Sequence, residues 1–219
     1  MPDSKNPAER HIIEDAFNPL VAQVTLAGAK FLTGLQTRWI RCQPVGAQRI
    51  YFANHTSHLD FVLLCSALPA LLRARTKPVA ATDYWDRGMV RAYLIHRVFR
   101  AIVIDRKSPD KAASPLAALI EALDCGDSLI LFPEGTRGNG EVLQPFKCGI
   151  YHVAKARPKL ELVPVWIHNT HRVMPKGTAL PIPLLCSVSF GTPLHFVFDE
   201  PKDVFLLRLQ RAVLELSKQ

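Results

Sequence analysis

A histidine and an aspartate five positions apart form the first motif that could do chemistry. His55 and Asp60 stand in the segment Asn-His-Thr-Ser-His-Leu-Asp at 54–60. A carboxylate at this spacing can hold one imidazole nitrogen and stabilise the imidazolium, which leaves the other nitrogen to accept a proton near neutral pH. In a simpler interpretation, Ser57 and Asp60 are only the cap and first-turn acid of a helix.

The second motif is Phe-Pro-Glu-Gly-Thr-Arg-Gly at 132–138, directly after an apolar run. Gly135 permits a close backbone approach, Thr136 offers a hydroxyl and an amide, and Arg137 offers a planar fork that suits two phosphate oxygens. Glu134 either hydrogen-bonds a substrate hydroxyl or orients Arg137, and the residue types do not separate these roles. Without the first motif, the segment would be interpreted as an ordinary Pro/Gly loop with a solvated arginine.

Two more cations follow apolar runs. Arg106 comes just after the run at 101–104, and Lys147 stands where a helix is expected to begin, beside which a phosphate can bind. Each alone fits a surface charge, but together with Arg137 they indicate a site for a phosphorylated substrate.

A metal site is the competing interpretation of the histidines. His55, His58 and Asp60 are close in sequence, and His168 and His171 could add ligands. The spacing does not match a zinc or di-metal loop, so no metal is expected.

Short apolar runs separated by helical patterns predict the elements that must position these motifs. The strands are expected at 49–54, 78–82, 101–104, 128–132, 161–167 and 184–190, and the helices at 57–70, 84–99, 110–123, 147–157 and 204–216. This alternation predicts an α/β fold, with a mixed, largely parallel sheet covered by helices on both faces. Each motif follows a strand, which is where open α/β sheets place their ligands.

The N-terminal region is expected to be a disordered tip at 1–9, followed by an amphipathic helix that starts near Glu14 or at Asn18. Its apolar stripe comprises Leu20, Val21, Val24, Ala27, Phe31, Leu32 and Leu35. The stripe packs on the core or rests in a membrane interface, with Trp39 and Arg38 or Arg41 at the headgroup level. Gln23 and Lys30 argue against a membrane-spanning helix. We expect 1–37 to be a membrane-facing region and 38–219 to be the catalytic domain.

Composition limits the classes of protein that fit. The chain has 219 residues, 48% hydrophobic and 21% charged, which excludes disordered and collagen-like classes. Its net charge of +8 predicts an anionic partner. The basic residues are scattered and no nucleic-acid recognition motif is present, so nucleic acid is not expected. Five widely spaced cysteines fit reduced thiols, and the polar first twelve residues do not fit a signal peptide.

Together, these motifs resemble the glycerolipid acyltransferase family, which includes glycerol-3-phosphate and lysophosphatidic acid acyltransferases. The family's four blocks match in order and spacing: Asn-His-x4-Asp at 54–60, Ile-Asp-Arg at 104–106, Phe-Pro-Glu-Gly-Thr-Arg at 132–137 and Val-Pro-Val at 163–165. Two positions depart from the family pattern. Gly138 stands where serine is common, and Arg100-Ala101 precede the second block in place of a glycine.

The resemblance implies that His55, assisted by Asp60, takes the proton of a glycerol hydroxyl, and that the oxygen attacks the thioester of acyl-CoA or an acyl-carrier protein. It further implies an acceptor-binding set, which comprises Arg106, Glu134, Gly135, Thr136, Arg137 and Lys147. No metal or redox cofactor would be required. The acceptor would be a lysophospholipid such as 1-acylglycerol-3-phosphate, and the enzyme of phospholipid biosynthesis would sit peripherally on the cytoplasmic face of an anionic membrane.

Other functions remain open at this point. The acceptor could be glycerol-3-phosphate or another lyso-lipid. A hydrolase of thioesters or lipid esters could use the same His55 and Asp60 to activate water, and a basic lipid-binding protein would need neither. The acyltransferase hypothesis requires His55 and Arg137 to face one cavity.

Overall fold

The computed structural model describes residues 7–82, 88–104, 114–140, 142–173 and 182–219. Within them, seven strands form one sheet in the order β1-β7-β6-β2-β5-β3-β4. The strands are β1 (Gln36–Trp39), β2 (Arg49–Ala53), β3 (Thr76–Ala81), β4 (Ile102–Ile104), β5 (Ser128–Leu131), β6 (Glu161–His168) and β7 (Ser187–Phe190). All neighbours pair in parallel except β6 and β7, which are antiparallel. The predicted mixed, largely parallel sheet is confirmed.

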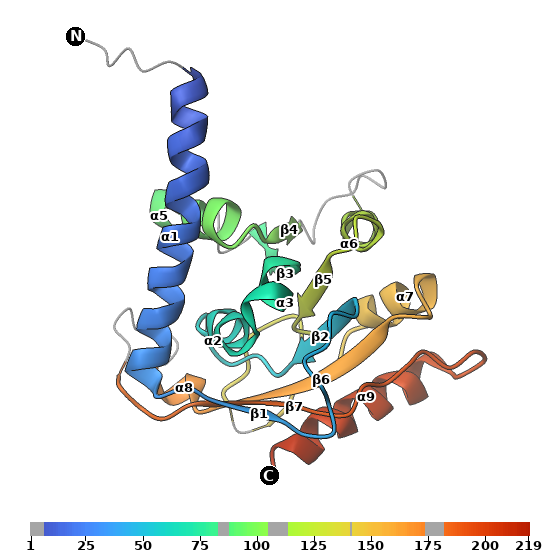
Figure 1. Cartoon of the computed structure of the whole chain (residues 1–219). Helices are drawn as coiled ribbons and strands as arrows, with labels where there is room; N and C mark the ends of the chain where they lie inside the picture. Colours follow the sequence, from blue (N-terminus) through green and yellow to red (C-terminus); the bar gives the residue numbers. More distant parts are fainter. Residues whose placement is uncertain (1–6, 83–87, 105–113, 141, 174–181) are drawn as a thin grey trace.

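Helices cover both faces of this sheet (Figure 1). They are α1 (Pro7–Thr33), α2 (Asp60–Ala67), α3 (Ala70–Ala74), α5 (Met89–Tyr93), the π-helix η1 (Leu94–Val98), α6 (Pro115–Asp124), α7 (Gly149–Ala156), α8 (Thr170–Val173) and α9 (Lys202–Leu216). The buried side chains of α1, α2 and η1 join one hydrophobic cluster, and those of α6, α7 and α9 join a second.

Strand β2 lies between the two clusters and contributes to both. Tyr51 and Ala53 belong to the cluster under α1 and α2, whereas Ile50 and Phe52 belong to the cluster under α6, α7 and α9. Because side chains alternate across a strand, one short apolar run fills both cores. This explains why β2 is buried throughout and why its pattern does not alternate.

The sequence predicted six of the strands and missed β1. Its sequence, Gln-Thr-Arg-Trp, is mostly exposed at the edge of the sheet and lacks an apolar run. The helix expected at 57–70 is instead α2 and α3, which are separated by Pro69. The short helix α8 was also missed, because four residues are too few for a periodic pattern. Parts of the helices expected at 84–99 and 110–123 fall outside the described residues.

Helix α1 differs most from expectation. It begins at Pro7, so the predicted tip is wrong for residues 7–9. The face that packs on the domain carries Leu26, Ala29 and Thr33. Most of the predicted stripe faces outward, since Leu20, Val24, Phe31 and Leu32 are all exposed. The helix therefore packs on the core as one interpretation expected, but through a different face, and of the predicted stripe Leu35 packs against the core cluster.

Trp39 does not belong to that outward surface. Its ring stacks on Phe190 of β7, with the centroids 3.9 Å apart, and packs against the core cluster. Among the described residues, no helix is both long and apolar enough to cross a membrane.

Asn54 locks the carboxyl end of β2 to β6. Its side-chain amide donates to the carbonyl of Ile167 at 2.9 Å, and its Oδ1 accepts from the N–H of Ile167 at 2.8 Å. The side chain is buried, so water cannot replace these bonds. The next residue, His55, therefore leaves the strand from a fixed point.

We expect Asn54→Ala to lower the free energy of unfolding by about 2–4 kcal/mol, because it leaves two buried backbone groups of Ile167 without partners. Thermal unfolding followed by circular dichroism would measure this loss. Gln23→Ala, at an exposed position of α1, is the control and should change stability by less than about 0.5 kcal/mol. Equal melting temperatures for the two variants would contradict the role of Asn54.

Candidate active site

The two motifs meet because β2 and β5 are neighbours. These strands pair in parallel from Ile50 with Leu129 to Phe52 with Leu131, so the turns that follow them start side by side. The backbone N–H of Gly138 donates to the carbonyl of His55 at 2.8 Å. Parallel pairing thus brings together residues that are far apart in the sequence.

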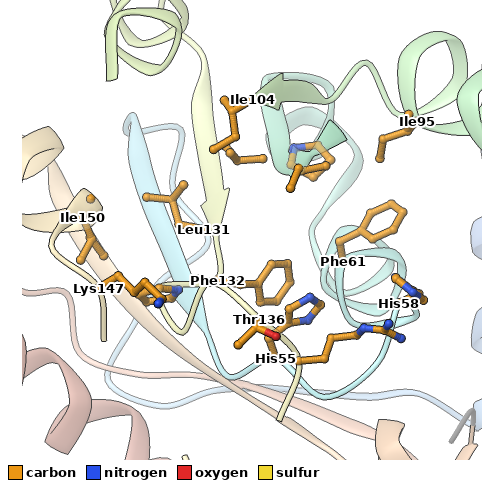
Figure 2. A pocket seen from close by; sticks show the side chains of 18 residues that line it. His55, His58, Phe61, Ile95, Ile104, Leu131, Phe132, Thr136, Lys147 and Ile150 are labelled. Carbon is orange, nitrogen blue, oxygen red and sulfur yellow. The ribbon is translucent and has the colours of Figure 1, made fainter. Parts of the chain in front are cut away.

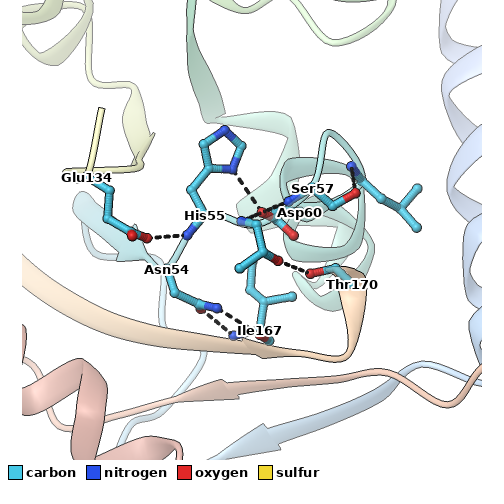
Figure 3. Close-up of polar contacts among 9 residues, drawn as sticks. Asn54, His55, Ser57, Asp60, Glu134, Ile167 and Thr170 are labelled. Carbon is cyan, nitrogen blue, oxygen red and sulfur yellow. Dashed lines mark hydrogen bonds and ion pairs between the residues drawn. The ribbon is translucent and has the colours of Figure 1, made fainter. Parts of the chain in front are cut away.

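One oxygen of Asp60 organises the turn that carries His55 (Figure 3). Oδ2 lies 2.8 Å from Nδ1 of His55 and accepts the backbone N–H groups of Thr56 at 2.6 Å and Ser57 at 2.9 Å. The carboxylate is buried, and these donors compensate for the lost hydration of Oδ2. Nδ1 beside a carboxylate carries the proton, which leaves Nε2 as the acceptor.

The capping-box interpretation of this motif holds only in part. Helix α2 begins after Leu59, which makes no side-chain capping bond. The carboxylate of Asp60 accepts the N–H of Ser57, as in a capping box, but it also accepts the N–H of Thr56 and contacts His55.

Two contacts fix the orientation of the imidazole. The ring of His55 stacks on Phe132, with the centroids 4.3 Å apart and the planes 24° from parallel. The hydroxyl of Thr56 lies 2.9 Å from that of Thr170, which ties the turn to α8. Because neighbouring groups hold both the turn and the ring, His55 is pre-organised.

The sequence predicted a substrate-binding role for Glu134, and its position in the structure does not fit that role. Its side chain is buried and is not part of the cavity wall. Its Oε1 accepts the N–H of His55 at 2.6 Å, and its Oε2 accepts the N–H of Gln144 at 2.8 Å. Burial raises the pKa of this carboxyl, although the two N–H donors act in the opposite direction. Glu134 therefore holds the backbone on which His55 is carried.

A cavity of about 560 Å³ lies in front of these turns (Figure 2). Five of the predicted site residues line it: His55, Gly135, Thr136, Arg137 and Lys147. The expectation that His55 and Arg137 face one cavity is confirmed. Arg106 lies outside the described residues.

Gly135 is required by its neighbour Lys147. The residue has a positive φ of 71°, which favours glycine, and a Cβ there would lie 3.0 Å from Cε of Lys147. The stem of Lys147 therefore runs across the bare backbone of Gly135, and the N–H of Lys147 donates to Pro133 at 2.8 Å. The glycine turn thus positions a cation at the cavity wall.

The rest of the cavity wall is mostly apolar, and sequence reasoning did not assign it. Its side chains come from α2, β3, η1, β4, β5 and α7, and include Phe61, Val79, Ile95, Ile104, Leu131 and Ile150. His58, which was considered above only as a possible metal ligand, also lines the cavity. No local motif marks these residues, because they come together only through the order of the strands.

No group of three potential metal ligands is found among the residues that the structure describes. His55 and Asp60 bond to each other and to backbone, as a proton-transfer pair would.

The cavity can bind an elongated, mostly apolar molecule with an anionic end. Its polar wall carries a histidine held by a buried carboxylate, together with Arg137 and Lys147. Such an arrangement can remove a proton from a hydroxyl close to a bound phosphate.

Comparison with known proteins gives consistent results. A curated 1-acyl-sn-glycerol-3-phosphate acyltransferase of Cocos nucifera is 28% identical over 74% of this chain and 54% of its own length. One of the same name from Limnanthes alba is 30% identical over 67% of this chain and 50% of its own, and the human alpha form is 28% identical over 68% and 51%. The chain therefore spans about half the length of the curated relatives it matches.

The crystal structure of the 1-acyl-sn-glycerophosphate (LPA) acyltransferase PlsC from Thermotoga maritima has a similar fold. It superposes with a TM-score of 0.70 and 20% sequence identity over the whole of this chain and 85% of that one. A family model described as Acyltransferase matches residues 37–168, which is more than half of the chain and includes both motifs. The chain belongs to this acyltransferase family.

Proposed function

We propose that this protein transfers a fatty acyl group from acyl-CoA or an acyl-carrier protein to a hydroxyl of a lysophospholipid such as 1-acylglycerol-3-phosphate. The observation that carries the proposal is the single cavity shared by the His55–Asp60 pair and Arg137. The relatives named above support the choice of acceptor, since their names specify acylation of 1-acylglycerol-3-phosphate.

In the proposed reaction, Nε2 of His55 takes the proton of the acceptor hydroxyl as its oxygen attacks the thioester carbonyl. Asp60 stabilises the imidazolium that forms, because its Oδ2 is only 2.8 Å from Nδ1. The tetrahedral intermediate then collapses, the carbon–sulfur bond breaks, and the thiolate takes the proton from Nε2. The histidine returns to its starting state, and the products are an ester and a thiol.

The two cations on the cavity wall have a different task. Arg137 and Lys147 line the cavity together with His55, and both can pair with the acceptor phosphate. The apolar wall formed by β3, η1 and α7 then suits an acyl chain. The acceptor hydroxyl and the donor thioester would thus meet at the imidazole of His55, while Arg137 and Lys147 hold the acceptor phosphate at one side of the cavity.

A hydrolase with the same His55–Asp60 pair is the second candidate. It needs a water near His55 but no group that binds an acceptor phosphate. The presence of Arg137 and Lys147 on the cavity wall therefore favours acyl transfer over hydrolysis.

The outward stripe of α1 supports a place at the membrane surface. Phe31 is 88% exposed and Val24 is 64% exposed, whereas Lys30 lies exposed beside the stripe. Apolar residues flanked by a cation are typical of helices that rest in the interface of an anionic bilayer. We propose peripheral attachment to the cytoplasmic face by this surface.

We expect His55→Ala to lower kcat for acyl transfer by at least about 100-fold, since it removes the proposed general base. The melting temperature should shift by only a few degrees, because the buried backbone bonds to Asp60 remain. A radiolabelled acyl-CoA assay and thermal unfolding measure the two effects. His152→Ala on the exposed side of α7 is the control. Unfolding of the His55 variant at room temperature would instead show a structural histidine.

We expect Arg137→Ala to raise the KM for the lyso-acceptor about tenfold to 100-fold, since a charge-assisted bond to phosphate is lost. The KM for acyl-CoA should stay within about twofold of the wild-type value. Arg211→Ala removes an equal charge from the exposed side of α9 and serves as the control. If only the donor KM changes, the assignment is reversed; if free fatty acid forms at the full rate, the protein is a hydrolase.

We expect Glu134→Gln to lower kcat about tenfold with the acceptor KM nearly unchanged. A glutamine amide cannot accept from both His55 and Gln144, so the turn that carries the base loses one buried bond. Steady-state kinetics with varied acceptor separates the two parameters, and Glu121→Gln on exposed α6 is the control. A rise in acceptor KM at constant kcat would return Glu134 to the substrate-binding role.

A further inference from the structure

Residues 182–185 present apolar side chains to solvent near the C-terminal end of α1. Ile182 is 55% exposed, Leu184 is 40% exposed and Leu185 is 67% exposed. Figure 1 shows the chain here passing below α1 before it enters β7. Large apolar side chains that gather on an exposed surface indicate a site of interaction.

The backbone of this segment is held in place. The N–H of Ile182 donates to Val173 of α8 at 2.7 Å, and the carbonyl of Leu185 accepts from the side chain of Asn169 at 2.9 Å. The N–H of Cys186 then donates to Thr33 of α1 at 2.9 Å. These bonds anchor the backbone at both ends of the segment, so its apolar side chains remain exposed to solvent.

Leu185 continues the outward stripe of α1. Leu20, Val24, Ala27 and Phe31 follow one another at helical spacing, and the next position of that series is Gly34. A Cβ on Gly34 would lie 2.6 Å from Cδ2 of Leu185, so the leucine occupies the space of the missing side chain. The stripe and residues 182–185 therefore form one apolar surface.

The exposed charges next to this surface are cationic. Residues 16–33 of α1, all of α8 and the segment itself contain no Asp or Glu, whereas the acids of α1 stand at positions 9, 14 and 15, toward its other end. Lys30 is exposed on α1 itself, and Arg172 is exposed on α8, to which Ile182 bonds. An apolar surface with neighbouring cations is complementary to an anionic bilayer.

We propose that residues 182–185 are a second lipid-contacting segment, which enters the interface of an anionic phospholipid membrane beside α1. This inference rests on the proposed function. An enzyme whose acceptor is a membrane lipid would gain a defined orientation on the bilayer from this second contact. If α1 alone lay in the membrane interface, the protein could still rotate about the axis of α1. A second contact beside the axis restricts that rotation.

The segment also lies on the side of the catalytic turn. Ile182 bonds to Val173 of α8, and Thr170 of the same helix bonds to Thr56, next to His55. Membrane contact here places lipid close to the elements that carry the proposed base. A second copy of the chain fits the same surface less well, because a two-fold contact would bring the cations of both copies together.

The triple variant I182S/L184S/L185S tests the proposal in the full-length chain. With vesicles of equal parts phosphatidylcholine and phosphatidylglycerol, we expect at least about a tenfold weaker vesicle partition coefficient by sedimentation. V204S/L207S removes equally exposed apolar side chains from α9 and should bind vesicles as the wild type does. Unchanged vesicle binding by the triple variant would overturn the proposal.

Acyl transfer to a lyso-acceptor dispersed in detergent tests the proposed function separately, because no bilayer is needed there. If the wild-type protein transfers acyl groups but does not bind vesicles, the inference is overturned and the proposed function stands. A dimer in solution that I182S/L184S/L185S dissociates would also overturn it.

L184W provides a second measurement if the triple variant does not fold. Fluorescence of the added tryptophan should be quenched by lipids brominated on their acyl chains, beyond the quenching of the wild-type protein. Equal quenching of the two proteins would contradict insertion.

Discussion

The N–H of His55 points at a buried carboxylate, and this bond joins the two motifs of the site. Glu134 receives it at 2.6 Å and extends its other oxygen to Gln144. The turn after β2 and the turn after β5 are thereby held as one unit. The position of the imidazole, and of the cations that follow Glu134, depends on this link.

Two buried acids have separate tasks here. Asp60 accepts an imidazole nitrogen and two backbone N–H groups, so its charge is directed at His55. Glu134 contacts only backbone N–H groups among its described partners, and burial raises its pKa. A buried carboxylate is costly unless donors surround it. Glu134 meets that condition at both oxygens, and Asp60 meets it at Oδ2, whereas Oδ1 of Asp60 is buried without a hydrogen-bond partner in the part of the chain that the structure describes.

The cavity and the outer surface suit the same kind of molecule. Inside, His55, Arg137 and Lys147 face apolar side chains from β3, η1 and α7. Outside, the stripe of α1 and residues 182–185 form an apolar surface with Lys30 and Arg172 as neighbouring cations. A lipid with an anionic headgroup combines these properties, and this supports the proposed reaction at a membrane.

The motifs and six of the strands could be predicted from local chemistry, since apolar runs form buried strands and polar turns follow them. The shared cavity of His55 and Arg137 was expected because both follow strands, and the parallel pairing of β2 with β5 produces it. The role of Glu134, the apolar cavity wall and the outward direction of the α1 stripe became visible only in the folded chain. Each depends on which distant segment lies opposite: the turn at His55 for Glu134, η1 and β3 for the wall, and α2 for the buried face of α1. Such pairings arise from strand order and packing, which leave no periodic signal in the chain.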